Sequence, residues 1–333
     1  MHKTVRTTLE GLNLGEAQLY RDLCVFPVLA RGSEGPDYLT LEEAVEAHLI
    51  TVTEVSEDGS VPNLKVVSRA DQPILLLDGE ELQGAKQNRV LNTTVLLAPH
   101  SKTVVPVSCT EQGRWSYETD EFAPSENVMD IAIRSKKMRS VSRSLRQNES
   151  YASDQGEVWD EIDKFSVKAC VSSPTGAMKD VFTERKKDYD ECLKAFPLVE
   201  GQVGLVAFVN GRPAGLDVLS SPRAFALLHD KLVRSYASDT IMRGRKEARE
   251  VTEDNVQDFV ARILACQETG HDAVSLGEDY RYTSRGVCGS ALVFEKICIH
   301  AAFFASEADE QQQDQPSMSS LRMRRGFRDG SRN

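Results

Sequence analysis

One polar run interrupts two apolar, strand-like segments and constrains the fold more than any other feature of the sequence. Ten of the twelve positions 78–89 are charged, polar or glycine. The run follows the apolar residues 74–77 and precedes the strand-like stretch 90–97. Short segments of this kind, bounded by glycine and polar residues, predict β-strands. Charged side chains held at the ends of rigid strands are typical of a ligand site.

The composition limits the class of protein. With 333 residues, 40% of them hydrophobic, the chain is long enough for two cores. The formal net charge of −11 disfavours nucleic acid as a partner, but it leaves room for a local basic cluster that binds one small anion. We expect no membrane partner and a cytoplasmic protein, because neither a leader pattern nor a long uncharged apolar segment occurs. Seven cysteines without a CxxC pair predict reduced thiols.

The order of the predicted elements indicates an α+β protein. Short strand-like runs fill residues 1–120, which we expect to form a β-rich sheet or barrel-like module. Helical periodicity dominates residues 121–197, the expected helical connector, which includes one helix over 178–196. Residues 198–305 follow the order strand, strand, helix, helix, strand, strand, which predicts an α+β module with antiparallel hairpins and not a wound parallel sheet. The polar residues 306–333 predict a disordered tail.

Local signals support individual elements. The Asn-Gly pair at 210–211, between two apolar runs, predicts a hairpin with a type I′ turn. Ser221 is a suitable N-cap for one helix, and Thr252 caps another that we expect to run to Gly270. The stretch 126–146 has a narrow apolar stripe among basic residues, which is typical of a helix with a solvated face.

A predicted hairpin brings the polar run next to a second polar cluster. Residues 89–97 and 102–108 should pair antiparallel through a tight turn, with positions whose numbers sum to about 199 lying opposite each other. Asn88 then faces Glu111. The polar residues 109–115 therefore join the first polar run at one end of the sheet.

The combined cluster has the residue types of a site for a phosphate-bearing small molecule. Guanidinium and ammonium groups bind phosphate, and an indole ring stacks on a base. We assign Glu81 and Glu111 as candidate catalytic residues; the cofactor stays open, with Mg²⁺ as the candidate cation beside ligand phosphates. Glu80 and Glu81 are not a carboxylate pair, because adjacent strand residues point to opposite faces. The candidate ligand-binding residues are Glu80, Lys86, Gln87, Asn88, Arg89, Arg114, Trp115, Arg281 and His300.

Each part of this assignment has a plainer alternative. The charged sheet end is also typical of a solvated surface, where Glu111 pairs with an arginine for little net stability. Arg281 and His300 are included because a protein with two modules commonly places its site between them, so we expect one of them to approach residues 80–89 across a cleft. The alternative for these two residues is a structural histidine and a solvated arginine.

Two segments resemble a known family. Residues 79–94, GEELQGAKQNRVLNTT, and residues 109–115, CTEQGRW, are similar to the ARG and rhodanese-phosphatase-superfamily-associated protein family, and the resemblance extends over about residues 10–305. The family is named for gene neighbourhoods with ADP-ribosylglycohydrolases and rhodanese-phosphatase proteins. The resemblance implies a protein that acts near ADP-ribose, NAD or nucleotide-phosphate metabolism. Our leading hypothesis is therefore binding of an ADP-ribose-like or nucleotide-phosphate ligand, and processing of that ligand is left open. The alternative is a non-enzymatic ligand-sensing or protein-interaction module in NAD or ADP-ribose metabolism.

Overall fold

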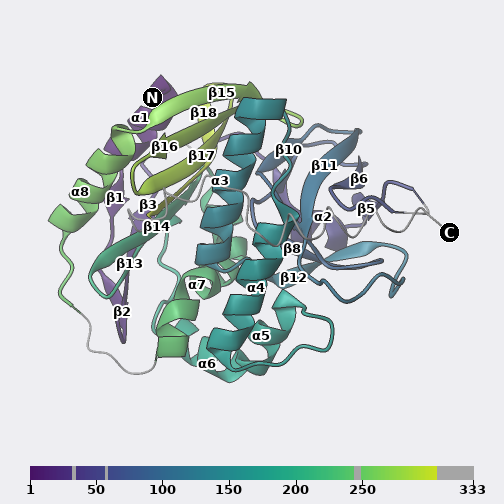
Figure 1. The fold of residues 1–333 in the computed structure, drawn as a ribbon. Helices are drawn as coiled ribbons and strands as arrows, with labels where there is room; N and C mark the ends of the chain where they lie inside the picture. Colours follow the sequence, from purple (N-terminus) through teal and green to yellow (C-terminus); the bar gives the residue numbers. More distant parts are fainter. Residues whose placement is uncertain (32–34, 57–58, 244–248, 306–333) are drawn as a thin grey trace.

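The computed structural model describes residues 1–31, 35–56, 59–243 and 249–305. These residues form a mixed α+β fold with three sheets (Figure 1). The α+β class predicted from the order of elements is therefore confirmed. The tail predicted at 306–333 lies outside the described residues.

A nine-stranded antiparallel sheet forms one half of the molecule. Its order is β1-β3-β13-β14-β18-β17-β16-β15, with β2 also paired to β3. β3 lies in the expected β-rich module of residues 1–120 but pairs with β13 of the expected α+β module, so strand pairing crosses the boundary between them. The division into modules stays a prediction. The strands are β1 (Asn13–Leu14), β2 (Gln18–Tyr20), β3 (Leu23–Leu29), β13 (Gln202–Val209), β14 (Arg212–Leu219), β15 (Gln267–Asp272), β16 (Glu278–Ser284), β17 (Val287–Phe294) and β18 (Ile297–Ala305).

Two smaller sheets form the β-rich half. One has the order β12-β8-β9-β11-β6-β5 and the other β10-β7-β4, and apolar side chains of both pack with helix α2 into a separate core. The elements are β4 (Leu39–Thr40), α2 (Leu41–Glu46), β5 (Ile50–Glu54), β6 (Asn63–Ser68), β7 (Ile74–Leu76), β8 (Glu80–Gly84), β9 (Arg89–Leu91), β10 (Val95–Leu97), β11 (Lys102–Cys109) and β12 (Phe122–Val128).

The hairpin predicted for residues 89–108 is correct at one end and wrong at the other. β9 pairs with β11 as expected, with Arg89 opposite Cys109, so the paired numbers sum to 198 and not 199. β10 instead pairs with β7, and the first part of β11 pairs with β6. The chain leaves the hairpin at residues 92–94, because these side chains hydrogen-bond to partners on other elements.

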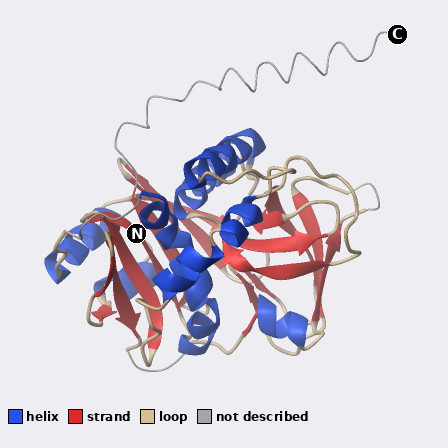
Figure 2. Ribbon diagram, turned by 90° about the horizontal axis from the view of Figure 1, so that it is seen from below, coloured by secondary structure: helices blue, strands red, loops and turns tan. Residues whose placement is uncertain are grey.

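Helices cover both faces of the nine-stranded sheet (Figures 1 and 2). α1 and α8 pack on one face, whereas α3 and α7 pack on the other and lie between this sheet and the β-rich half. Each face buries its own apolar core. The helices are α1 (Lys3–Glu10), α3 (Ile131–Asn148), α4 (Gln155–Ala169), α5 (Met178–Glu184), α6 (Lys186–Leu193), α7 (Pro222–Arg243) and α8 (Glu253–Leu264).

Several helix boundaries differ from prediction. α3 begins at Ile131 and not at 126, because β12 occupies the preceding residues. The single helix expected over 178–196 is two helices, α5 and α6, on either side of Arg185. α8 ends at Leu264, well before the expected Gly270, and the mostly exposed edge strand β15 follows. An exposed polar edge strand has no apolar alternation by which to recognise it.

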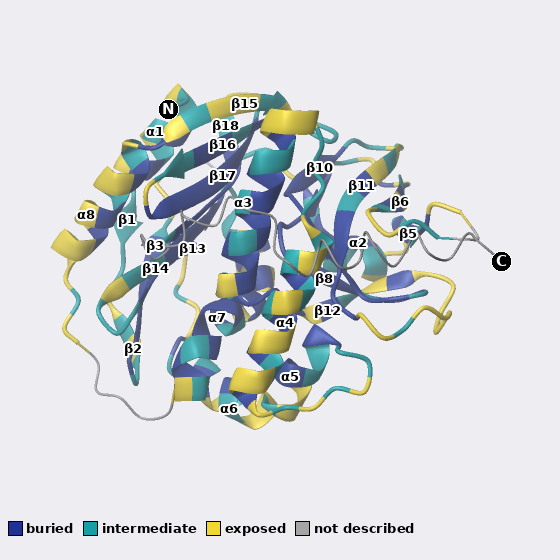
Figure 3. Ribbon diagram, in the orientation of Figure 1, coloured by how far each residue is buried: buried dark blue, intermediate teal, exposed yellow. Residues whose placement is uncertain are grey.

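The largest departure concerns α3, which was expected to have a solvated basic face. Arg134 and Lys137 are 0% and 1% exposed, and nine of the 18 residues of the helix are buried. Figure 3 shows these buried residues among intermediate and exposed ones along α3. Among the helices of the described ranges, none has the length and apolar composition needed to cross a bilayer.

Candidate functional site

The two polar segments converge at the ends of β9 and β11, as predicted. Arg114 donates from Nε to Glu111 Oε2 at 2.9 Å and from Nη2 to Asn88 Oδ1 at 3.2 Å. The backbone N–H of Asn88 also donates to Glu111 Oε2, at 3.3 Å. Glu111, Arg114 and Asn88 therefore form one bonded group, although their role in a ligand site stays a prediction.

Arg89 is the centre of this region. Its side chain is fully buried, and Nη1 donates to Gln87 Oε1 at 3.0 Å. Its Nε and Nη2 atoms have no hydrogen-bond partner among the described residues. The nearest carboxylate is that of Glu54, whose Oε1 lies 3.7 Å from Nη2, too far for a hydrogen bond. Arg89 thus keeps two donors for another partner.

Glu54 was missed by the sequence analysis. It ends β5, where the buried positions alternate as Ile50, Val52 and Glu54, so its carboxylate points to the interior. Both of its oxygens lack hydrogen-bond partners in the described part of the chain. Glu54 occupies a strand position at which the alternating pattern requires an apolar residue, and this exception is the signal that could have revealed Glu54 from the sequence.

Aromatic and cationic side chains cover the Arg89 and Glu54 pair. The Trp115 ring lies 5.6 Å from the Arg89 guanidinium and 5.5 Å from Lys86 Nζ. A Cβ placed on Gly59 would lie within 3.5 Å of Trp115, Lys86 and Glu54, so these three side chains meet at the backbone of Gly59. Trp115 is 47% exposed, so its ring reaches from the buried pair to solvent. We call Glu54, Lys86, Arg89, Arg114 and Trp115 the Arg89 site.

The ionisable groups of this region respond to burial in different ways. Burial lowers the pKa of the Arg89 guanidinium. For Glu111 burial alone would raise the pKa, but hydrogen bonds from Arg114 and Thr175 outweigh it and hold the pKa below its usual range. Burial raises the pKa of the Cys109 thiol to about 11, so this thiol is protonated at neutral pH.

Glu80 and Glu81 do not lie with the Arg89 site. In the β8–β9 pair Arg89 is opposite Leu82, so Glu81 points to the other face of the sheet. There Glu81 accepts hydrogen bonds from Thr110 and Ser125, each at 3.1 Å, and burial raises its pKa to about 7. Glu80 Oε1 accepts from Lys231 on α7, at 3.1 Å.

Arg281 and His300 belong to a second cluster. Arg281 Nη2 donates to Thr93 Oγ1 at 2.7 Å, and His300 Nδ1 lies 2.7 Å from Thr94 Oγ1. His300 Nε2 bonds to Asp217 at 3.1 Å. These contacts place both residues beside the segment that follows the polar run, in contact with Thr93 and Thr94 and not with Arg89.

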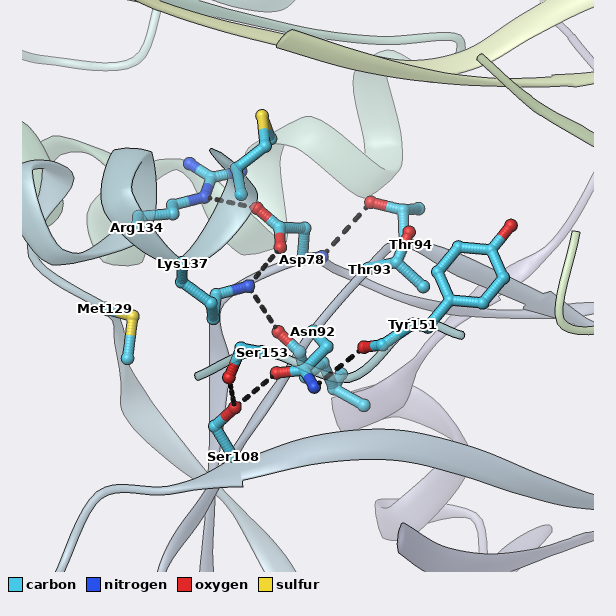
Figure 4. Close-up of polar contacts among 12 residues, drawn as sticks. Asp78, Asn92, Thr93, Thr94, Ser108, Met129, Arg134, Lys137, Tyr151 and Ser153 are labelled. Atoms are coloured by element: carbon cyan, nitrogen blue, oxygen red, sulfur yellow. Dashed lines mark hydrogen bonds and ion pairs between the residues drawn. The ribbon is translucent and has the colours of Figure 1, made fainter. Parts of the chain in front are cut away.

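The second cluster is a buried charge network (Figure 4). Arg134 donates from Nε to Asp78 at 2.9 Å and from Nη1 and Nη2 to Asp217 at 3.0 and 2.7 Å. Lys137 also donates to Asp78. Gly79 has a φ of +78° and touches the Arg134 side chain, so both its conformation and its lack of a Cβ are required. The sequence analysis missed Asp78, Arg134, Lys137 and Asp217 as partners.

The ion pairs in the network shift the pKa values of its side chains. Burial alone would raise the pKa of Asp78, but Lys137 and Arg134 hold it below its usual range. Burial would likewise lower the pKa of Arg134, and pairing with Asp217 and Asp78 raises it instead. Pairing therefore favours the charged forms of Asp78, Asp217 and Arg134, whereas burial lowers the pKa of Lys137.

The described residues contain no cluster of side chains that could hold a metal ion, and one surface hollow is unsuited to phosphate. No group of three or more His, Cys, Asp or Glu side chains is placed there to hold a metal ion. A surface hollow of about 490 Å³ lies beside the end of α3 and strands β15 and β16. Its lining includes Glu149, Asp272 and Glu278, whose charges would repel a phosphate.

Comparison with known proteins identifies the family. The model of the ARG and Rhodanese-Phosphatase-superfamily-associated Protein domain matches residues 11–304, which is most of the chain, so the chain belongs to this family. No curated protein matches. No solved structure matches either.

Proposed function

We propose that this member of the ARG and Rhodanese-Phosphatase-superfamily-associated Protein family binds an ADP-ribose-like or other nucleotide-phosphate ligand at the Arg89 site. The observation that carries the proposal is the fully buried guanidinium of Arg89, whose Nε and Nη2 have no hydrogen-bond partner among the described residues. Leaving buried donors unpaired costs about 1 to 3 kcal/mol per group, and more for a charged one. Water or a ligand must therefore pair them.

Phosphate fits the unpaired edge of Arg89. Nε and Nη2 lie on one side of the planar guanidinium and can donate in parallel to two phosphate oxygens. Lys86 and Arg114 add two positive charges nearby, and Trp115 offers a ring face for a base. Residues 112–121 lie outside the strands and outside the β-bridge between Glu111 and Ala177, so Trp115 can move aside without breaking a strand pair.

Processing of the bound ligand is the further part of this proposal. Glu111 is the carboxylate that would move a proton, and Mg²⁺ would enter with the ligand phosphates. One observation favours the alternative of a ligand sensor without catalysis: Glu111 is already engaged by Arg114, Asn88 and Thr175. Incubation of the protein with ADP-ribose and Mg²⁺, followed by chromatography of the products, distinguishes the two.

Binding is tested by calorimetry with ADP-ribose, ADP and pyrophosphate, each with and without Mg²⁺. Arg89→Ala and Arg114→Ala should each weaken binding by about 1.5 to 3 kcal/mol, the range for hydrogen bonds to charged groups. Arg6→Ala, on the exposed face of α1, is the control and should bind like the wild type. Equal affinity of the wild type and both site variants for every ligand would refute the phosphate site.

A further inference from the structure

We infer that Glu54 makes the Arg89 site selective for ligands that carry a vicinal diol, such as the 2′,3′-hydroxyls of a ribose. This inference rests on the proposed function, because it assumes that a phosphate-bearing ligand occupies the site. It assigns to Glu54 a role in specificity that is separate from the phosphate contact of Arg89.

The unpaired polar atoms of the described residues concentrate here. Eleven buried side-chain nitrogen or oxygen atoms lack a hydrogen-bond partner, and five of them belong to Glu54, Asn88 and Arg89. Glu54 is 6% exposed, so solvent does not satisfy its carboxylate. Glu54 and Arg89 form an ion pair at 3.7 Å, which is too long for a hydrogen bond, so the hydrogen-bonding capacity of both groups stays unused. A ligand for this site must therefore offer donors as well as acceptors.

The chemistry of a carboxylate identifies the donors. An ionised carboxylate only accepts hydrogen bonds, whereas phosphate oxygens are acceptors too, so a phosphate cannot satisfy Glu54. An ammonium ligand would satisfy it, but Lys86, Arg89 and Arg114 lie nearby and would repel a further cation. Neutral donors therefore fit, and the ribose of a nucleotide supplies two of them side by side as its 2′- and 3′-hydroxyls.

A vicinal diol matches both oxygens of one carboxylate. Two neighbouring hydroxyls can donate in parallel to the two oxygens. In dinucleotide-binding folds an acidic residue likewise accepts a hydrogen bond from a ribose hydroxyl. In a nucleotide, the diol and the phosphate belong to the same ribose unit, so one ligand can bond to Glu54 and Arg89 at the same time. The adjacent Trp115 ring then lies where a base can stack.

The test compares two ligands that differ only in the diol. Calorimetry measures Kd for ADP and for 2′,3′-dideoxy-ADP with the wild type, Glu54→Gln, Glu54→Asp and the control Glu46→Gln, which removes an exposed charge from α2. We expect the wild type and Glu46→Gln to prefer ADP by about 10- to 100-fold, the range for hydrogen bonds to a charged group. Both Glu54 variants should lose most of this preference while binding the dideoxy compound about as well as the wild type does.

Each failure has a distinct meaning. Equal binding of ADP and dideoxy-ADP by the wild type would overturn the inference and leave the phosphate site intact, since water alone would then pair Glu54. A full preference for ADP in Glu54→Gln would also overturn it, because the diol would be recognised elsewhere. If neither nucleotide binds the wild type, with or without Mg²⁺, the proposed function fails. Melting temperatures confirm that the variants are folded; if Glu54→Gln is not, Glu54→Asp decides.

Discussion

Two buried arginines differ in what surrounds them. Arg134 uses Nε, Nη1 and Nη2 to bond to Asp78 and Asp217 at 2.7 to 3.0 Å. Arg89 is equally buried, but its nearest carboxylate lies at 3.7 Å, and two of its nitrogens have no partner in the described residues. Burial is therefore no guide to function by itself. The missing partners of Arg89 make it the candidate for ligand binding, whereas the completed bonds of Arg134 join the two halves of the fold.

The largest expected effect is the loss of Arg134. Arg134→Met removes the main counter-charge of the buried Asp217 and one of the two cations that pair with Asp78, so the free energy of unfolding should fall by about 3 to 5 kcal/mol. Arg89→Met is the matched variant, because it removes the same group from a site with one distant carboxylate; its loss should be less than half as large. Urea denaturation measures both. Equal losses would break the distinction between a structural and a ligand-binding arginine.

The sequence predicted local relations better than distant ones. The hairpin at Asn210 is confirmed, because the positive φ values of 53° and 74° at the Asn-Gly pair are a property of these two residues alone. The contact between Asn88 and Glu111 is also confirmed, although the register differs by one residue from the predicted one. These relations need no knowledge of the rest of the fold.

The missed relations join residues far apart in the chain. Arg134 looked like part of a solvated face because its periodicity is local, whereas Asp78 and Asp217 lie 56 and 83 residues away. Glu54 was missed for the same reason: β6 and β11 separate β5 from β9 in the six-stranded sheet, so no local pattern places Glu54 beside Arg89. Such burial comes from tertiary packing, which overrides the local pattern.

Glu81 extends the comparison to a buried carboxylate with no cation hydrogen-bonded to it. Burial raises its pKa to about 7 from an ordinary value of 4.5. The folded state therefore binds the Glu81 proton more tightly than the unfolded state does. The stability that this proton contributes to the folded state is fully present below pH 4.5 and is lost as the pH rises through 7. The full loss corresponds to about 3 kcal/mol. Glu81→Gln, measured by urea denaturation from pH 5 to 8, should remove this pH dependence.

Glu111→Gln is the control, because the pKa of Glu111 is shifted in the opposite direction from that of Glu81. The pKa of Glu111 is held below its usual range, so its contribution is present at neutral pH and is lost as the pH falls into the acid range. Glu111→Gln should therefore lower stability at neutral pH, whereas Glu81→Gln should raise it above pH 7. If Glu81→Gln shows the same pH dependence as the wild type, the Glu81 carboxyl is not the group that titrates.

The smallest expected effect separates the two clusters most directly. His300 bonds to Thr94 and Asp217, and Thr94 Oγ1 also accepts from the backbone N–H of Asp78, which fits an imidazole with its proton on Nε2. His300→Ala leaves Asp217 one donor short and should lower the free energy of unfolding by about 1 to 3 kcal/mol. Because His300 belongs to the network of Arg134 and not to the Arg89 site, ADP should raise the melting temperature of the variant as much as that of the wild type. A lost response to ADP with an unchanged melting temperature of the free protein would instead assign His300 to the ligand site and join the two clusters into one.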